Sequence, residues 1–133
     1  MVPPDYVINV WAEVAPILSR ALKTAEGRYT IADLFEECCG GGQTLWIAFD
    51  DQKRIVGALT TRVVNYPSRK MLSGQFCGGT RMAEWQDQML RILDIWAKDN
   101  DCSGFVMTGR YGWERILRRY GWRPIAKVYV KDY

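Results

Sequence analysis

The sequence predicts one α/β (α+β) domain over residues 1–133, with a mixed central sheet of about five to six strands and helices on both faces. Three observations predict this class. Apolar residues recur with helical spacing in the first forty residues, and compact strand-like runs follow between residues 44 and 76. Helical and strand patterns then alternate to the end, which predicts a sheet that changes from antiparallel to parallel pairing.

The first helical stripe runs from Val7 to Ala25. Pro16 lies inside it, and because proline removes a helix hydrogen bond we expect either a kink or two short helices. Thr30 precedes Asp33 by three residues, which is related to a capping box and predicts the start of a second, short helix. Glycines 40–42 stop this helix and let the chain reverse direction.

Three strands are expected next. Residues 44–49 form a compact apolar run, residues 50–53 a polar turn, and residues 54–66 a long run rich in valine and threonine. This combination predicts a β-hairpin. After a second turn at residues 67–70, residues 71–76 are expected to return as a third antiparallel strand.

A glycine turn then leads into the longest helical pattern, from Met82 to Ala97. Its expected buried face consists of Met82, Trp85, Met89, Ile92, Leu93 and Trp96. Residues 104–108 predict a strand parallel to residues 71–76. A short helix follows, with its inward face expected at Trp113, Ile116, Leu117 and Tyr120. The alternation over residues 125–133 predicts a final strand.

Composition limits the function classes. The chain is 48% hydrophobic and 25% charged with a formal net charge of +3, which is typical of a globular protein. No apolar run approaches the roughly 20 residues of a membrane helix, and the amino terminus lacks the regions of a signal peptide. We therefore expect no membrane partner and a cytoplasmic location.

Histidine is absent from the sequence. This excludes Ser-His and Cys-His nucleophile pairs, histidine general bases and the commoner zinc sites. The cysteines include no C-x-x-C pair, and we expect free buried thiols at Cys38, Cys39, Cys77 and Cys102. We interpret the acidic pairs at 36–37 and 50–51 as a helix surface and a turn, and expect no metal site.

Two stretches and the element order carry a family resemblance. Residues 75–80 read Gln-Phe-Cys-Gly-Gly-Thr, similar to the pyrophosphate loop Q/R-x-x-G-x-G/A of the GCN5-related N-acetyltransferase (GNAT) family. Residues 116–122 are similar to that family's F-Y-x-K-x-G-F segment, and the order of elements resembles the GNAT fold over nearly the whole chain.

The resemblance implies that acetyl-CoA lies between the strands at 71–76 and 104–108. The residues that it implies for cofactor binding are Gln75, Gly78, Gly79, Thr80 and Arg81. A helix start with free backbone N–H groups suits a pyrophosphate, and Arg81 would add a donor. The alternative is that the glycines only permit a tight turn and that Arg81 is solvated.

The sequence departs from the family where catalysis would occur. Residues 71–76 contain no carboxylate to act as a base, and Leu117 stands where the family often has a tyrosine that acts as the general acid. Tyr120 falls on the apolar stripe, so we expect it in the core. Only residues 121–133 follow the last helix, where the family usually has two strands that wall the acceptor site. We therefore assign no catalytic residue.

Further details resemble small GNAT-fold proteins of tailed bacteriophages and prophages: Leu45-Trp46-Ile47, the Gly78-Gly79 turn followed by Trp85, and residues 109–115. This resemblance implies a protein with a degenerate catalytic site that acts by protein interaction, as a virion or assembly component or on a host protein. Its location would be the bacterial host cytoplasm or the virion. The alternative is an acetyl-CoA-dependent N-acetyltransferase that modifies an amine of a protein or small molecule.

An arginine cluster near the carboxyl end leaves nucleic-acid binding open. Its members are Arg110, Arg115, Arg118, Arg119 and Arg123. Such a face could contact nucleic-acid phosphates or the 3′-phosphate of the coenzyme, and nearby aromatic residues could stack on bases. The helical spacing favours a solvated face instead, and the pI near 8.7 is below the usual basic signature.

Overall fold

The computed structural model describes residues 1–109 and 112–133. Along the chain the elements are η1 (Pro4–Tyr6), α1 (Val7–Ala21), η2 (Leu22–Ala25), α2 (Ile31–Gly40), β1 (Thr44–Phe49), β2 (Ile55–Asn65), β3 (Lys70–Gly79), α3 (Met82–Asp99), β4 (Gly104–Met107) and α4 (Trp113–Arg118). None of the helices in these two ranges is long and apolar enough to cross a membrane.

The strands form a sheet in the order β1-β2-β3-β4. β1 pairs with β2 and β2 with β3 in antiparallel fashion, whereas β3 and β4 are parallel. The predicted change from antiparallel to parallel pairing is therefore confirmed. The predicted count of five to six strands was too high, because the described part of the chain contains four in this sheet.

The missing strand is the one predicted at residues 125–133. These residues are exposed and belong to no strand. An alternating pattern becomes a strand only where a neighbouring backbone completes the ladder, and no described strand pairs with this segment.

The interpretation of Tyr120 as a core residue was also wrong. α4 ends at Arg118, so Tyr120 lies in the following turn and is 37% exposed.

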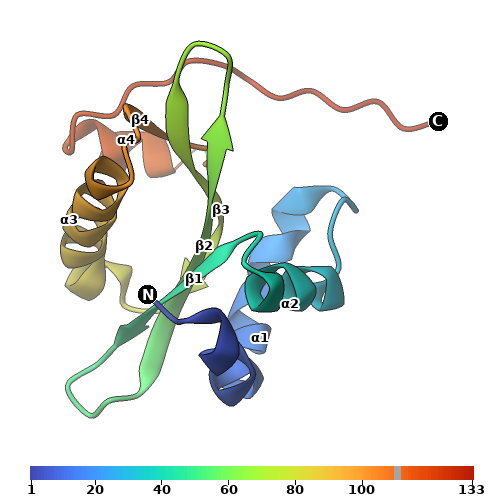
Figure 1. The fold of residues 1–133 in the computed structure, drawn as a ribbon, viewed down its shortest axis with the longest axis vertical. Helices are drawn as coiled ribbons and strands as arrows, with labels where there is room; N and C mark the ends of the chain where they lie inside the picture. Colours follow the sequence, from blue (N-terminus) through green and yellow to red (C-terminus); the bar gives the residue numbers. More distant parts are fainter. Residues whose placement is uncertain (110–111) are drawn as a thin grey trace.

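The sheet separates two cores, because successive side chains of a strand point to opposite faces. Figure 1 shows α3 on one face of the sheet and α1 and α2 on the other. The α1 and α2 side buries Val14, Leu18, Leu34, Leu45, Ala58 and Phe76. The α3 side buries Trp46, Leu59, Leu72, Trp85, Met89 and Leu93. The neighbours Leu45 and Trp46 thus belong to different cores, and the predicted arrangement of helices on both faces is confirmed.

The amino-terminal helices agree with the sequence with one exception. α1 is a single α-helix across Pro16, so the two-helix alternative was wrong. Pro16 lies on the exposed side of α1, where water can satisfy the carbonyl that proline leaves without a donor. The predicted cap of α2 is confirmed: Thr30 Oγ1 accepts from the Asp33 N–H at 3.1 Å, and Asp33 Oδ2 accepts from the Thr30 N–H at 2.9 Å.

α3 buries a narrower face than predicted. Trp85, Met89, Leu93 and Ala97 are buried, and Met82 and Trp96 are half-buried. Ile92 is 44% exposed, so its assignment to the buried face was wrong. It lies beside the buried stripe, one residue before Leu93, and its side chain is rotated toward solvent.

Candidate functional site

An irregularity in β3 marks the centre of the candidate site. Phe76 pairs with Thr60 of β2, but Gly74 pairs with Thr61, so Gln75 is an extra residue in the strand. Such a β-bulge takes the extra residue out of the regular ladder, and bulges are frequent next to active sites. The side chain of Gln75 donates from Nε2 to Ser73 Oγ at 2.7 Å. The bulge therefore lies inside the stretch that sequence analysis identified.

β3 and β4 separate at the same level. They pair only from Met71 to Gly74 on β3 and from Gly104 to Met107 on β4. Beyond Gly74, β3 continues to Gly79 with β2 as its partner. β4 ends at Met107, so the second half of β3 has no strand beside it on this side, and the ladder is open at the carboxyl ends of the parallel strands. In open α/β sheets, such points are preferred sites for ligands.

A groove of about 420 Å³ lies at this end of the sheet. Its walls come from one face of α1, from the start of β2, from the end of β3 and from the first residues of α3 and α4. The lining residues are Glu13, Ile17, Arg20, Ala21, Ile55, Val56, Cys77, Gly78, Gly79, Thr80, Met82 and Trp113. Glu13 and Arg20 supply its charged side chains, one carboxylate and one guanidinium.

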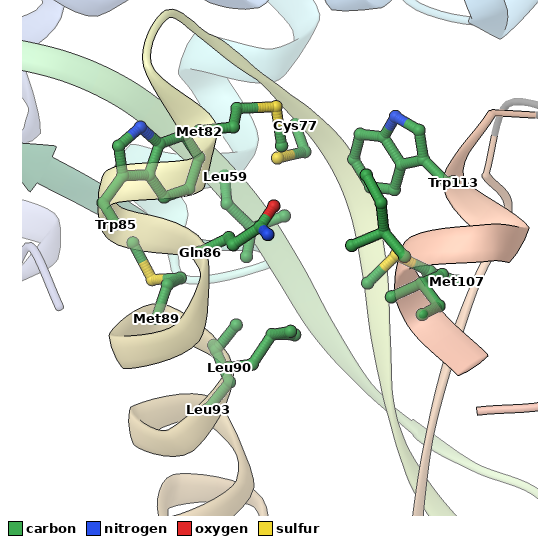
Figure 2. Close-up of a pocket in the computed structure, with 12 residues that line it drawn as sticks. Leu59, Cys77, Met82, Trp85, Gln86, Met89, Leu90, Leu93, Met107 and Trp113 are labelled. Atoms are coloured by element: carbon green, nitrogen blue, oxygen red, sulfur yellow. The ribbon is translucent and has the colours of Figure 1, made fainter. Parts of the chain in front are cut away.

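A narrow apolar cavity of about 50 Å³ adjoins the groove, between α3 and α4. Figure 2 shows side chains of α3, among them Trp85, Met89 and Leu90, opposite Met107 and Trp113. Cys77, Met82 and Trp113 line both the groove and this cavity, so the two spaces meet at these side chains. Among the residues that line the narrow cavity, Gln86 is the one with a side-chain amide.

The two predicted glycines have structural roles in the strand. Gly78 lies against α1, where a Cβ atom would be 3.1 Å from the Ile17 carbonyl oxygen. Gly79 has a φ of +137°, and a Cβ atom there would overlap the carbonyl oxygen of Val56. Both are the last residues of β3, so the strand continues into the stretch that was expected to be a loop.

Thr80 and Arg81 are engaged with protein groups. The Thr80 N–H donates to the Val56 carbonyl oxygen at 2.8 Å. Arg81 adopts a left-handed conformation with a φ of 55° and is the N-cap residue directly before α3. Its guanidinium pairs with Glu84 at 2.8 Å and with Asp50 at 3.5 Å, and these carboxylates, Glu84 first, raise its pKa. Arg81 is thus neither a simple solvated residue nor an unpaired cation.

The first turn of α3 still offers backbone donors. Its first intrahelical bond runs from the Glu84 N–H to the Arg81 carbonyl oxygen at 2.9 Å. The N–H groups of Met82 and Ala83 precede that bond and have no partner within the helix. These N–H groups lie at the positive end of the helix dipole. The N–H groups of Met82 and Ala83 are therefore candidate donors to an anion, whereas the N–H of Thr80 in the predicted stretch already bonds to Val56.

Glu13 and Arg20 were not among the residues predicted from the sequence. They lie on one face of α1 together with Ile17 and Ala21, and this face turns toward the end of β3. Arg20 forms no ion pair with any residue that the structure describes. The only signal in the sequence is that these two charged residues border the apolar stripe of a helix.

The arginine cluster lies away from the groove. Arg115, Arg118, Arg119 and Arg123 are exposed, and Arg118 pairs with Glu114 at 2.7 Å. Arg110 is outside the described residues, as is Tyr111 in the stretch 109–115. The exposure agrees with the interpretation of a solvated face. In the ranges 1–109 and 112–133, no three Cys, Asp or Glu side chains are grouped so that they could hold a metal ion.

Comparison with known proteins identifies the fold. No protein-family model and no curated protein matches the sequence. The ribosomal-protein-alanine N-acetyltransferase from Brucella melitensis biovar Abortus 2308 superposes with a TM-score of 0.67 at 16% identity over 94% of both chains. Glucosamine-6-phosphate N-acetyltransferase from Arabidopsis thaliana gives 0.68 at 11% identity, over 95% of this chain and 93% of that one.

A transcriptional regulator from Bacillus halodurans C-125 gives a TM-score of 0.73 at 15% identity, over 94% of both chains. These identities establish a common fold and leave the activity open. The chain has the mixed α/β fold of the GNAT acetyltransferases, so the predicted fold class is confirmed.

Proposed function

We propose that this chain binds acetyl-CoA where β3 continues beyond the end of β4 and that it transfers the acetyl group to an amine of a protein or small molecule. The observation that carries the proposal is that three features follow one another along the second half of β3. The last pair of β3 and β4 is at Gly74, the bulge at Gln75 follows it, and the next residues of β3, from Cys77 to Gly79, line the groove. When bound, the thioester supplies an activated acyl group.

The shape and donors of the site fit such a ligand. The narrow apolar cavity suits a slender chain, and it meets a wider groove at Cys77, Met82 and Trp113. The N–H groups of Met82 and Ala83 and the guanidinium of Arg20 are the donors for an anionic end. Of the predicted cofactor residues, Gln75 would take part through its backbone at the bulge, while Gly78 and Gly79 keep the strand close to its neighbours.

Glu13 is the residue that we propose as proton acceptor. Among the described residues that line the groove it is the one carboxylate, and it comes from α1 instead of the sheet. Glu13 would receive a proton from the amine and would thus act as the base that β3 lacks. General base catalysis of this kind raises the reaction rate by about 10² to 10⁴-fold. Holding the two reactants together in one groove supplies a further large part of the rate enhancement.

Two measurements test this proposal. Calorimetric titration with acetyl-CoA should show binding, and Arg20→Ala should weaken it by roughly tenfold or more, because a charge-assisted hydrogen bond is lost. Lys23→Ala is the matched control, since Lys23 is an exposed cation outside the groove that should leave binding unchanged. Absence of heat with the wild-type chain would refute the proposal.

The second measurement follows release of CoA thiol with a panel of amines. Glu13→Gln should lower the rate by about 10²-fold while the affinity for acetyl-CoA stays the same. Glu36→Gln, which changes an exposed carboxylate on α2, should keep the wild-type rate. A Glu13→Gln variant with full activity would remove Glu13 from its proposed role.

One set of contacts favours a second candidate, a degenerate site in a protein that acts by interaction, as a phage virion or assembly component or on a host protein. The Thr80 N–H donates a hydrogen bond to the Val56 carbonyl oxygen, and the Arg81 guanidinium forms ion pairs with Glu84 and Asp50. Two of the donors implied for the pyrophosphate are therefore already used. A wild-type titration without heat, together with the presence of the chain in purified virions, would support this candidate.

A further inference from the structure

We propose that Trp85 is a positioning residue of the site. Its indole N–H holds the junction between β3 and α3, and through this junction it sets the direction of the backbone N–H groups at the start of α3. The inference rests on the proposed function, because these N–H groups are the donors assigned to the anionic end of acetyl-CoA. Trp85 belongs neither to the predicted cofactor residues nor to the residues that line the groove.

The indole of Trp85 bonds to the residue that precedes the turn into α3. Its Nε1–H donates to the Thr80 carbonyl oxygen at 2.9 Å. The Thr80 N–H is bonded as well, to the Val56 carbonyl oxygen at 2.8 Å. Thr80 is therefore held on both sides, by β2 through its N–H and by α3 through its carbonyl oxygen.

The bond from Trp85 fixes the peptide group that enters α3. The Thr80 carbonyl and the Arg81 N–H belong to one planar trans peptide, so they point in opposite directions. Because the carbonyl is turned toward the Trp85 indole, the Arg81 N–H is turned away from it, and it has no partner among the described residues. The N–H groups of Met82 and Ala83 follow directly. The orientation of one peptide thus determines where this series of donors begins.

The backbone of Arg81 needs such support. Its φ of 55° and ψ of 37° are left-handed, which is unfavourable for an arginine, and the residues after it are helical. A change from left-handed to helical backbone makes successive N–H groups face a common concavity. Glu84 and Asp50 hold the guanidinium of Arg81, but only the bond from Trp85 acts on the peptide itself.

Gly57 gives the Trp85 ring a fixed place against the sheet. A Cβ atom at Gly57 would lie 2.8 Å from Cε2 of the indole and would overlap Cζ2, so the ring lies directly on the backbone of β2. Gly57 is the pairing partner of Gly79, the last residue of β3. Trp85 is only 7% exposed. A buried ring that is held by β2 can position the junction more precisely than a solvated side chain can.

Trp85 also connects the two parts of the proposed site. Its ring lines the narrow apolar cavity together with Met82 and Met89, and Figure 2 shows these side chains on α3. The ring would therefore contact the slender part of the ligand, whereas the indole N–H would act only on the donors for the anionic end. These two roles can be separated by experiment.

Replacement of Trp85 by benzothienylalanine, which keeps the bicyclic ring and has sulfur in place of the N–H, tests the inference. Calorimetric titration should show a dissociation constant for acetyl-CoA that is raised by roughly tenfold, because the donors lose their alignment. The affinity for acetyl-pantetheine, which lacks the pyrophosphate, should stay within about twofold in an NMR titration. A merely structural role of the N–H would not change the ratio of the two constants.

Trp96→Phe is the matched control. Trp96 lies on the same helix and packs against Trp46 with ring centroids 5.6 Å apart, but it lines neither the groove nor the narrow cavity. Both dissociation constants should therefore stay at their wild-type values. Trp85→Phe should weaken the binding of both ligands, and that of acetyl-CoA more, since it removes the N–H and part of the cavity wall.

The outcomes separate this inference from the proposed function. If the wild-type chain binds acetyl-CoA and the benzothienylalanine variant binds both ligands as the wild type does, or loses both equally, Trp85 has no positioning role and the proposed function stands. Should the modified chain fail to fold, the same comparison is made with Trp85→Phe, where equal losses for the two ligands would overturn the inference. A wild-type chain that gives no heat with acetyl-CoA would overturn both.

Discussion

The backbone N–H of Thr80 donates a hydrogen bond of 2.8 Å to the carbonyl oxygen of Val56. This bond extends the contact between β2 and β3 by one residue beyond Gly79, the last residue of β3. α3 then begins directly after Arg81, which turns the chain in a left-handed conformation. The junction between strand and helix is therefore held by β2, and its amides are only partly available to a ligand.

Replacement of Gly79 by alanine should destabilise the protein by at least about 2 kcal/mol, because a side chain at this backbone conformation is strained and also meets Val56. The free energy of unfolding in urea measures the loss. Gly112→Ala is the control, since a Cβ atom at Gly112 has no neighbour within 4 Å. A Gly79→Ala variant as stable as the control would show that the junction is more adaptable than the structure indicates.

Much of the fold could be predicted because its signals are local. The capping pair Thr30 and Asp33, the turn at residues 50–53 and the helical spacing after Met82 each depend on residues close in sequence. The unpaired segment at residues 125–133 could not be predicted, because its alternation is that of a strand. Whether a strand forms depends on a neighbouring edge, and no local pattern specifies that neighbour.

The candidate site was predicted only in part, for the same reason. The stretch from Gln75 to Arg81 does lie where β3 and β4 separate. However, the bulge at Gln75 and the bond from Thr80 to Val56 depend on the register of β3 against β2. Glu13 and Arg20 become part of the site only because α1 crosses the end of β3, more than fifty residues later in the sequence.

The indole of Trp46 donates from Nε1 to Thr61 Oγ1 at 2.9 Å, and both residues are buried. Trp46→Phe and Thr61→Val should each cost about 1–3 kcal/mol, because each leaves a buried polar atom without its partner. The double variant should cost less than the sum, with a coupling of about 0.5–1.5 kcal/mol. Urea unfolding of all four proteins measures this. As a control, the losses of unfolding free energy caused by Trp11→Phe and Thr61→Val should add, since Trp11 packs in the other core.

Burial raises the pKa of the Cys38 thiol to about 12, and Cys39 and Glu37 add to the effect. Because the thiolate is the reactive species, iodoacetamide at pH 8 should leave Cys38 unmodified in the folded protein and modify it in urea. Peptide mass spectrometry measures both. The neutral thiol is favoured by folding, so this contribution to stability is complete below about pH 8.5 and declines as the pH rises toward 12. Rapid labelling of folded Cys38 would contradict its burial.

The carboxylate of Asp50 links the β1–β2 turn to the start of α3. It accepts from the N–H groups of Gln52 and Arg54 at 2.9 Å, and it pairs with the Arg54 and Arg81 guanidinium groups. These contacts, and above all the bond from the Arg54 backbone, lower the pKa of Asp50. The ionised form is therefore favoured by folding, and its contribution is complete above the unfolded pKa of about 3.9.

As the pH falls below about 4 and through the lowered pKa of folded Asp50, that contribution should be lost, since the unfolded chain is protonated first. Urea unfolding between pH 2 and pH 7 should show a shallower acid decline for Asp50→Asn than for the wild-type chain. Asp51→Asn is the matched control, because the Asp51 carboxylate makes none of these bonds in the described structure. Identical acid declines for all three proteins would mean that the bridge from Asp50 to Arg54 and Arg81 does not persist in solution.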